Sequence, residues 1–305
     1  MIKIPAIKKG DKIGIIAPAS PPNIKKMEKG IKLLKEWGFK TQEAPHLRDV
    51  RGYLAGEDKK RAADLHNFFE NDNINAIWCA GGGYGTPRLL QMLDYDLIKK
   101  NPKPFIGYSD ITALHLAFNK FSNLITFHGP MVATELGDEP NEITIESIKK
   151  MLFNNYKIDI LKKFTLDKLE IVNGGIAEGE ITGGNLALLA ATIGTPYELE
   201  TDNKLLFIED IGEEAYNIDR MLSQLKNAAK LDNLAGLVIG NFTDSESKNY
   251  DPSLTVDEVI NDYFADKNYP VIRHLPFGHD KTQLTIPLGV KAKLDTSNNS
   301  LKIFN

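Results

Sequence analysis

The sequence contains a single cysteine, Cys79, and this scarcity excludes two kinds of structure. One thiol cannot form a disulfide within the chain, and it cannot build a thiolate-rich metal site. The six histidines do not compensate, because the nearest of them in the sequence are not at metal-ligand spacing. We therefore expect neither a disulfide framework nor a bound metal.

Long apolar runs are also missing from the 305 residues, so we expect no membrane-spanning helix. The basic start of the chain is followed by a short apolar stretch that ends at Pro18. This stretch indicates a first strand rather than a signal peptide, which predicts a cytoplasmic protein. The formal net charge is -4, and the lysines are interspersed with acids instead of forming a basic block. Nucleic acid is therefore not an expected partner.

Short apolar runs alternate with amphipathic stretches through the first half of the chain. This alternation is typical of a parallel sheet covered by helices, and it predicts an α/β fold with a Rossmann-like or flavodoxin-like sheet. The predicted strands are 12–17, 40–44, 74–79, 105–107 and 126–129. The predicted helices are 24–37, 59–71, 86–93, a helix from Asp110, and 143–153.

The second half has a different pattern and predicts a second, smaller, β-rich domain. Residues 155–170 are polar and lysine-rich, so we expect a linker between a domain at 1–154 and a domain at 171–305. The last apolar stretches, 283–295 and 300–305, alternate with turn residues in the manner of antiparallel strands.

Ser109 follows a predicted buried strand and precedes an apolar helix, in the stretch PFIGYSDITALHLAF. A serine at this place is usually an N-cap, because its hydroxyl satisfies a free amide of the first helical turn. The same bend can hold a nucleophile clear of a sheet, as in hydrolases. The second glycine of the G-x-S-x-G elbow is missing here, so the local sequence leaves both roles open.

A nucleophilic serine needs a base, and the base needs an acid that fixes its tautomer. Among the histidines, His279 lies in a loop after a glycine, where a side chain can face a cleft. An apolar strand in LLFIEDIGEE ends with Glu209 and Asp210, and either acid could serve. Successive side chains of a strand point to opposite faces, so only one of the two can face the histidine. The alternative is that one of these acids caps the following helix.

The glycine loop, residues 80–85 (AGGGYG), follows the third predicted strand. Its backbone N–H groups are unobstructed by side chains and could stabilise an oxyanion together with the amide of Asp110, the residue after the nucleophile. The loop and Ser109 should meet, because the carboxyl ends of adjacent parallel strands share one edge. The alternative readings are a phosphate cradle or a tight turn.

Two other classes compete with a serine hydrolase. Cys79 could be the nucleophile of an amidotransferase-like site, although a thiol inside a buried strand is usually inert. Alternatively, the glycine loop could bind a phosphate or sugar in a non-catalytic module. Arg88 follows this loop and could bind a substrate carboxylate, or it could lie on a solvated helix face.

Eight segments in order resemble the LD-carboxypeptidase family of serine peptidases, the muramoyltetrapeptide carboxypeptidases. They are GDKIGIIAPAS, AIWCAGGGYGTPRLL, FIGYSDITALHLAF, TFHGPMVATE, EGEITGGNLALLAATIGTPYE, LLFIEDIGEEAYNIDRMLSQLK, GLVIGNF and LPFGHDKTQLTIPLG. No single segment is specific, but the set spans most of the chain. The resemblance implies a Rossmann-like domain that carries the serine and a β-rich domain that carries the other catalytic residues.

The resemblance implies a catalytic triad of Ser109, Glu209 and His279, with no metal and no organic cofactor. It implies an oxyanion hole from the amide of Gly82 or Gly83.

The implied reaction releases the terminal D-alanine of murein tetrapeptides during cytoplasmic peptidoglycan recycling, in a homodimer. A related branch of microcin-immunity peptidases cleaves peptidyl-nucleotides and carries additional aromatic residues that stack on adenine. No inserted aromatic loop is evident here between Ser109 and Glu209, so the murein substrate is favoured over a peptidyl-nucleotide.

Overall fold

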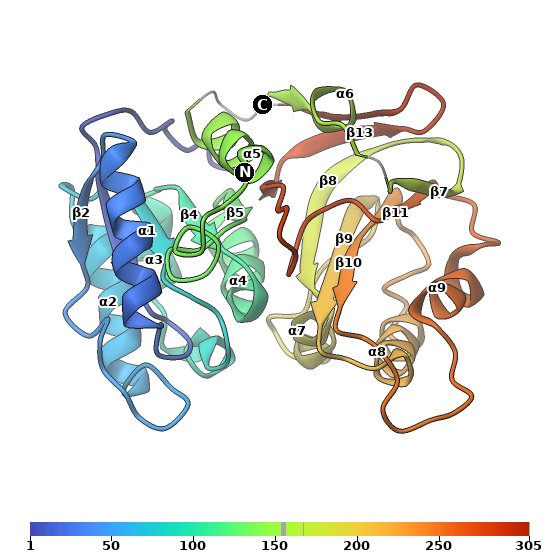
Figure 1. Ribbon diagram of the computed structural model, residues 1–305, viewed down its shortest axis with the longest axis horizontal. Helices are drawn as coiled ribbons and strands as arrows, with labels where there is room; N and C mark the ends of the chain where they lie inside the picture. The colour runs from blue at the N-terminus through green and yellow to red at the C-terminus, as the bar shows by residue number, and fades with distance from the viewer. Residues whose placement is uncertain (154–156, 167, 305) are drawn as a thin grey trace. The chain divides into compact units, whose positions relative to one another are not determined.

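The structure is a computed structural model that describes residues 1–153, 157–166 and 168–304 (Figure 1). Its contacts divide the chain into two compact units. Unit 1 contains Met1–Tyr156 and Lys281–Gly289, and unit 2 contains Lys157–Asp280 and Val290–Asn305. This division differs from the expected domains, because residues 281–289 join the first unit.

Unit 1 is built on a six-stranded sheet with the order β12-β5-β4-β3-β1-β2. Neighbouring strands are parallel except β12, which pairs antiparallel with β5 at one edge. Every residue of β3 is buried, as expected for a strand covered by helices on both faces. The predicted Rossmann-like or flavodoxin-like sheet is confirmed. The strands are β1 (Lys12–Ile16), β2 (Lys40–Glu43), β3 (Ala76–Cys79), β4 (Phe105–Gly107), β5 (Thr126–His128) and β12 (Ile286–Leu288).

Helices α2, α3 and α4 pack side by side on this sheet, and α1 lies in front of it in Figure 1. The helices of unit 1 are α1 (Ile24–Glu36), α2 (Asp58–Glu70), α3 (Tyr95–Lys100), α4 (Thr112–Ser122) and α5 (Glu142–Phe153). The single helix predicted over 86–93 is wrong. Two 3-10 helices, η1 (Thr86–Arg88) and η2 (Leu90–Met92), occupy this segment, and the backbone becomes extended at Leu93. The sequence prediction also missed α3, whose N-cap Asp94 accepts a hydrogen bond from the amide of Leu97.

Unit 2 contains a mixed eight-stranded sheet with the order β6-β14-β13-β8-β9-β10-β11-β7. Its centre, β8 to β11, is parallel, and antiparallel strands flank it on both sides. The predicted β-rich second domain is confirmed. The strands are β6 (Ile158–Asp159), β7 (Glu170–Asn173), β8 (Ile176–Asn185), β9 (Lys204–Ile211), β10 (Gly236–Thr243), β11 (Val271–Arg273), β13 (Lys291–Asp295) and β14 (Ser300–Ile303).

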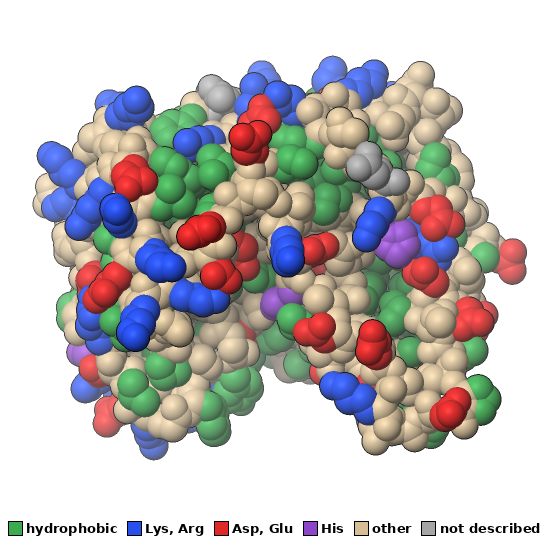
Figure 2. Space-filling view, viewed as in Figure 1, with side chains coloured by type: hydrophobic (Ala, Val, Ile, Leu, Met, Phe, Trp, Pro, Cys, Tyr) green, Lys and Arg blue, Asp and Glu red, His purple; other side chains and the backbone are tan. Residues whose placement is uncertain are grey.

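Helices of unit 2 include a short one inside the segment that was expected to be a linker. β6 and α6 form within residues 155–170 and pair with or pack on β14; residues 155, 156 and 167 lie outside the described residues. Of the described helices, none is both long and apolar enough to cross a membrane. The helices are α6 (Ile160–Lys163), α7 (Leu186–Thr192), α8 (Ala215–Asn227) and α9 (Val256–Phe264). Basic and acidic side chains are interspersed on the face shown in Figure 2.

Candidate active site

Ser109 lies in the nucleophile bend, residues 107–111, between β4 and α4. The strand ends at Gly107, and a single 3-10 turn, η3 (Ser109–Ile111), leads into the helix. Ser109 has a φ of 63°, in the left-handed region that residues other than glycine seldom occupy. Among the described residues no side chain caps η3, so the capping role, one of the two that the local sequence left open for the Ser109 hydroxyl, is not realised. The bend instead holds a strained residue at the carboxyl end of a buried strand, as a nucleophile elbow does.

The glycine loop lies directly against this bend. A Cβ at Gly82 would be 2.9 Å from Ser109 Cβ and 3.1 Å from Ser109 Oγ, so the close approach requires glycine. Gly83 faces elsewhere, because a Cβ there would collide with the Ser20 hydroxyl. In the described part of the chain, the backbone N–H groups of Gly82, Gly83 and Asp110 have no hydrogen-bond acceptor. These three amides are therefore unpaired within the described structure.

Asp110 ties the glycine loop to the nucleophile bend. Its Oδ2 accepts a hydrogen bond from the amide of Thr86 at 2.8 Å, and its carbonyl oxygen accepts one from the Thr86 hydroxyl at 2.5 Å. Burial raises the pKa of the Asp110 carboxyl, and the hydrogen bonds from Thr86 offset part of that rise. The buried Arg61 adds a second tie, because its Nη1 donates to the carbonyl oxygens of Pro18 and Gly85.

Glu209 and His279 form a hydrogen-bonded pair within unit 2. The Glu209 side chain is fully buried at the end of β9, and its Oε2 lies 2.8 Å from Nδ1 of His279. The His279 side chain is 13% exposed, whereas the Glu209 carboxylate is shielded from water. Gly278 has a φ of 91°, and any side chain there would collide with the Glu209 carboxylate. Glycine at this position therefore allows the loop to bring the histidine onto the acid.

Asp210, the alternative acid, points to the opposite side of β9. Its carboxylate accepts hydrogen bonds at 2.8 Å from Nδ2 of Asn185 and from the amide of Ala187 in the first turn of α7. Burial, together with the negative charge of Glu209, raises the pKa of Asp210 to about 6. The alternation of side chains along the strand thus assigns the histidine contact to Glu209.

The backbone around His279 is held by the end of β10. The Thr243 hydroxyl donates to the carbonyl oxygen of His279 at 2.5 Å, and Nδ2 of Asn241 donates to Oδ2 of Asp280 at 2.5 Å. Both contacts join a strand of the parallel core to the histidine loop. They fix the position of the imidazole relative to β9 and its glutamate.

The remaining histidines and the cysteine have other surroundings. His115 is buried in α4, its Nε2 lies 2.8 Å from the carbonyl oxygen of Gly107, and burial lowers its pKa to about 4. His46 pairs with Asp64 through Nδ1 at 2.8 Å. Cys79 is completely buried, and burial raises the pKa of its thiol, which disfavours the reactive thiolate.

Arg88 is engaged by an acid of the same unit. Its guanidinium makes a bidentate contact with Asp58, with Nη2 to Oδ2 at 2.7 Å and Nε to Oδ1 at 3.1 Å. The arginine side chain is 39% exposed. A substrate carboxylate would have to share the guanidinium with Asp58, so substrate binding by Arg88 stays a prediction.

The predicted site residues thus form two groups, one in each unit. Unit 1 gathers Ser109, Gly82, Gly83 and Asp110, and unit 2 joins Glu209 to His279. Sequence reasoning missed Arg61 and Thr86, which fix the glycine loop. For Arg61, the signal in the sequence was its place four residues before Leu65, on the apolar face of α2, where a charged side chain is unusual. Among the described residues, no group of three or more His, Cys, Asp and Glu side chains could hold a metal ion.

Comparison with known families gives two matches that together cover both halves of the chain. Residues 13–129 match the LD-carboxypeptidase N-terminal domain. Residues 178–294 match the LD-carboxypeptidase C-terminal domain. The first match includes the glycine loop and Ser109, and the second includes Glu209 and His279.

Individual relatives are similar over nearly the whole length. A probable murein peptide carboxypeptidase of Bacillus subtilis (strain 168) is 43% identical over 299 residues, with 98% of this chain and 93% of that protein covered. The solved structure of MccF in complex with glutamyl sulfamoyl guanosine has a TM-score of 0.92 at 27% identity, covering 99% of this chain and 98% of that one. A muramoyltetrapeptide carboxypeptidase from Oxalobacter formigenes has a TM-score of 0.84 at 28% identity, covering 96% and 97%.

Proposed function

The chain belongs to the LD-carboxypeptidase family, and from this premise we propose that it is a serine carboxypeptidase that removes the terminal D-alanine from murein tetrapeptides. The two family matches confirm the predicted resemblance. The observation that carries the catalytic part is the buried Glu209 carboxylate at 2.8 Å from His279 Nδ1. A carboxylate in this position holds the imidazole with Nε2 unprotonated, which is the tautomer that a general base needs.

Ser109 is the proposed nucleophile. His279 removes the proton of the Ser109 hydroxyl as its oxygen attacks the carbonyl carbon that joins an L-configured residue to the terminal D-alanine. The imidazolium then donates this proton to the nitrogen of the departing D-alanine, and an acyl-enzyme remains. Water, deprotonated by the same imidazole, hydrolyses the ester and regenerates the hydroxyl.

The proposed oxyanion hole consists of backbone N–H groups on either side of the serine. Gly82 is preferred over Gly83 for one donor, because Gly82 approaches Ser109 whereas Gly83 faces Ser20. The amide of Asp110 is the second donor. Preformed amides of this kind stabilise the negative charge that develops in the transition state, and losing one costs about 100- to 1,000-fold in rate.

The proposed proton transfer requires the hydroxyl of Ser109 to reach Nε2 of His279 while substrate is bound. The two residues belong to different units of the chain, so both units must contribute to the working site. The enzyme is proposed to act in the cytoplasm on recycled peptides and to form a homodimer, both carried over from the family resemblance. Light scattering of the purified protein would test the dimer.

A decisive experiment incubates the protein with a murein tetrapeptide and follows the products by mass spectrometry. We expect release of D-alanine and a tripeptide, and loss of this activity in Ser109→Ala at an unchanged melting temperature. Retained turnover in Ser109→Ala would remove the serine from the mechanism. Calorimetry with nucleotides tests the non-catalytic binding module, which requires binding without any turnover.

A second candidate is cleavage of a peptidyl-nucleotide, favoured by the similarity to MccF. The Microcin C7 self-immunity protein MccF of Escherichia coli is 30% identical over 327 residues. A murein tetrapeptide carboxypeptidase of Pseudomonas aeruginosa is 33% identical over 290 residues. A peptidyl-adenylate analogue incubated in parallel separates the two, since the murein proposal requires the tetrapeptide to be the better substrate.

A further inference from the structure

The two residues before Ser109 in the nucleophile bend are held by side chains from other parts of unit 1. The carbonyl oxygen of Gly107 lies 2.8 Å from Nε2 of His115 in α4. The Tyr108 hydroxyl donates a hydrogen bond to Oε1 of Glu135 at 2.6 Å. Both contacts are made by side chains, so they fix the bend in addition to the backbone hydrogen bonds of β4.

His115 is completely buried among mostly apolar residues of α4, so its polar ring needs a compensating contact. A carbonyl oxygen only accepts hydrogen bonds, so Nε2 must carry the proton and donate it to Gly107. The other ring nitrogen, Nδ1, has no hydrogen-bond partner among the described residues. Burial lowers the pKa of His115 to about 4, which keeps the ring neutral near pH 7. The imidazole thus has one donor, and this donor points at the strand end two residues before Ser109.

The Glu135 carboxylate that accepts the Tyr108 hydroxyl is itself fixed. Its Oε2 accepts hydrogen bonds from the amide of Met131 at 3.0 Å and from the Thr134 hydroxyl at 2.6 Å. A hydrogen bond from a phenol to a carboxylate is charge-assisted and stronger than one between neutral groups. Tyr108 is 3% exposed, so its ring and hydroxyl are largely shielded from water. The residue directly before the serine is therefore held through its side chain.

These contacts bear on Ser109 because its backbone is strained. Tyr108 is extended, with a φ of -157°, whereas Ser109 has a φ of 63°, so the chain changes direction at one residue. Such a conformation persists only where the surrounding structure fixes it. Thr86 holds Asp110 after the serine, and the two contacts described above hold the chain before it. Without either of these contacts the bend could relax, and the serine hydroxyl and the Asp110 amide would move together.

We propose that His115 and the Tyr108–Glu135 pair are positioning residues for the proposed nucleophile. They act through the backbone of the bend rather than by contact with substrate, and they keep the Ser109 hydroxyl and the Asp110 amide directed at one carbonyl group. This inference rests on the proposed function and deepens it, because it names the residues that hold its nucleophile in place. A misplacement of about 1 Å in such a site costs about 100-fold in rate, and the loss of one of several contacts should cost less.

Tyr108→Phe is the first test, because it removes one oxygen atom and keeps the ring. We expect kcat for D-alanine release from a murein tetrapeptide to fall about tenfold, with KM changed less than about twofold. Tyr95→Phe is the matched control, since the Tyr95 hydroxyl donates to the carbonyl oxygen of Leu90 at the same distance, 2.6 Å, elsewhere in unit 1. This control should keep the wild-type kcat.

Two amide variants test His115. Glutamine places an N–H group close to the position of Nε2 and can still donate to Gly107, whereas asparagine is one methylene shorter and cannot reach it. We expect His115→Gln to keep at least about a third of the wild-type kcat and His115→Asn to lose about tenfold, again at similar KM. Well below the melting temperature, an effect on stability alone would leave both rates unchanged. Equal losses in the two variants would remove His115 from the proposal.

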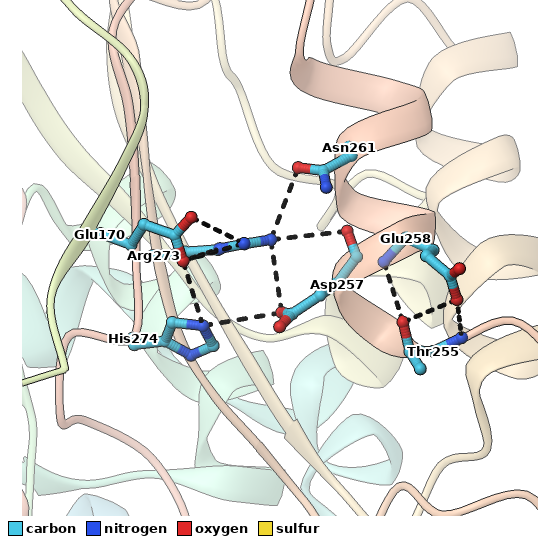
Figure 3. A network of polar contacts seen from close by, with 7 residues as sticks. All are labelled: Glu170, Thr255, Asp257, Glu258, Asn261, Arg273 and His274. Carbon is cyan, nitrogen blue, oxygen red and sulfur yellow. Dashed lines mark hydrogen bonds and ion pairs between the residues drawn. The ribbon is translucent and has the colours of Figure 1, made fainter.

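Glu258→Ala separates stability from positioning. Glu258 closes the capping box of α9 in unit 2, where its Oε2 accepts a hydrogen bond from the Thr255 amide at 2.7 Å (Figure 3). Its loss should lower the melting temperature by about 2 to 4 °C and leave kcat within about twofold of wild type. A tenfold loss of kcat in this variant would attribute the other losses to stability and overturn the inference.

Covalent labelling by a fluorophosphonate makes the test independent of the peptide substrate. The probe forms a bond between Ser109 Oγ and phosphorus and releases fluoride and a proton, and mass spectrometry of the intact protein measures the rate. Labelling should slow about tenfold in Tyr108→Phe and His115→Asn.

The proposed function and the positioning role can fail separately. If wild-type protein is labelled but releases no D-alanine from any tetrapeptide, the proposed substrate is wrong, and slower labelling of the two variants still supports the positioning role. Wild-type rates of turnover and labelling in Tyr108→Phe and His115→Asn would overturn the inference. So would a wild-type protein that neither cleaves a tetrapeptide nor is labelled, because the serine would then not be a nucleophile.

Discussion

Replacing Glu209 with glutamine removes one charge from the proposed triad and leaves the shape of the side chain intact. The carboxylate is completely buried and lies 2.8 Å from Nδ1 of His279. In the proposed reaction this histidine becomes an imidazolium, so the lost interaction is the attraction between two full charges. The variant can still accept a neutral hydrogen bond from Nδ1.

The size of the effect follows from the distance. Unit charges 2.8 Å apart attract by about 6 kcal/mol at an effective dielectric constant of about 20. A neutral hydrogen bond retains about 1 kcal/mol of this. The transition state is therefore destabilised by about 4 to 5 kcal/mol relative to the ground state, which lowers kcat about 1,000- to 10,000-fold.

The assay is the initial rate of D-alanine release from a murein tetrapeptide between pH 5 and pH 9. KM should change little, because Glu209 acts through His279 and does not touch substrate in the proposed mechanism. Glu198→Gln, an ion-paired glutamate of the same unit, serves as the control and should keep its turnover. A Glu209→Gln protein that is folded and retains more than about a tenth of wild-type kcat would refute the charge argument.

Three other changes test the surroundings of the site. Gly82→Ala should lower kcat by about 100-fold or more, because the new Cβ would lie 3.1 Å from Ser109 Oγ; Gly81→Ala, with no atom within 4 Å of its Cβ, should change it less than about twofold. Iodoacetamide should leave turnover unchanged, because Cys79 is fully buried; inactivation that Cys79→Ala prevents would restore the thiol as a candidate nucleophile. The pKa of Asp210 is about 6 in the folded protein, against 3.8 for an ordinary aspartate. Between about pH 4 and pH 6 the folded protein therefore keeps a proton that the unfolded chain has lost. As the pH rises through this window, Asp210 lowers the free energy of unfolding by about 3 kcal/mol. Urea unfolding of Asp210→Asn should show the variant gaining on wild type across that window, and a constant difference between the two would contradict the raised pKa.

The part of the fold that could be predicted is the part governed by apolar periodicity. The fully buried β3 and the amphipathic α1 were found within about two residues of their ends, because one continuous apolar run or one apolar stripe defines each. Residues 86–93 were predicted as one helix because their apolar spacing suits it, whereas the structure breaks them into two 3-10 turns. Thr86 is hydrogen-bonded there to Asp110, 24 residues later in the chain, and a local sequence pattern cannot predict such a contact.

The return of residues 281–289 to the first unit could not be predicted for a related reason. β12 pairs antiparallel with β5, about 160 residues earlier in the chain, so its partner is set by tertiary structure. The alternating apolar pattern predicted a strand correctly but carried no information on which sheet the strand joins. The choice between Glu209 and Asp210 had the same limit, since alternation puts them on opposite faces without saying which face meets His279.

The conformation of Ser109 adds an argument that its sequence context could not supply. A capping serine has extended backbone angles, and its hydroxyl binds an amide of the first turn. Ser109 has a φ of 63° instead, and a non-glycine residue in this region costs about 1 kcal/mol or more. The Asp110 contacts to Thr86 and the approach of Gly82 hold the residue in this bend. A hydroxyl kept at a strained position, without the hydrogen bond that would explain a cap, is better accounted for by an attacking role than by helix stability.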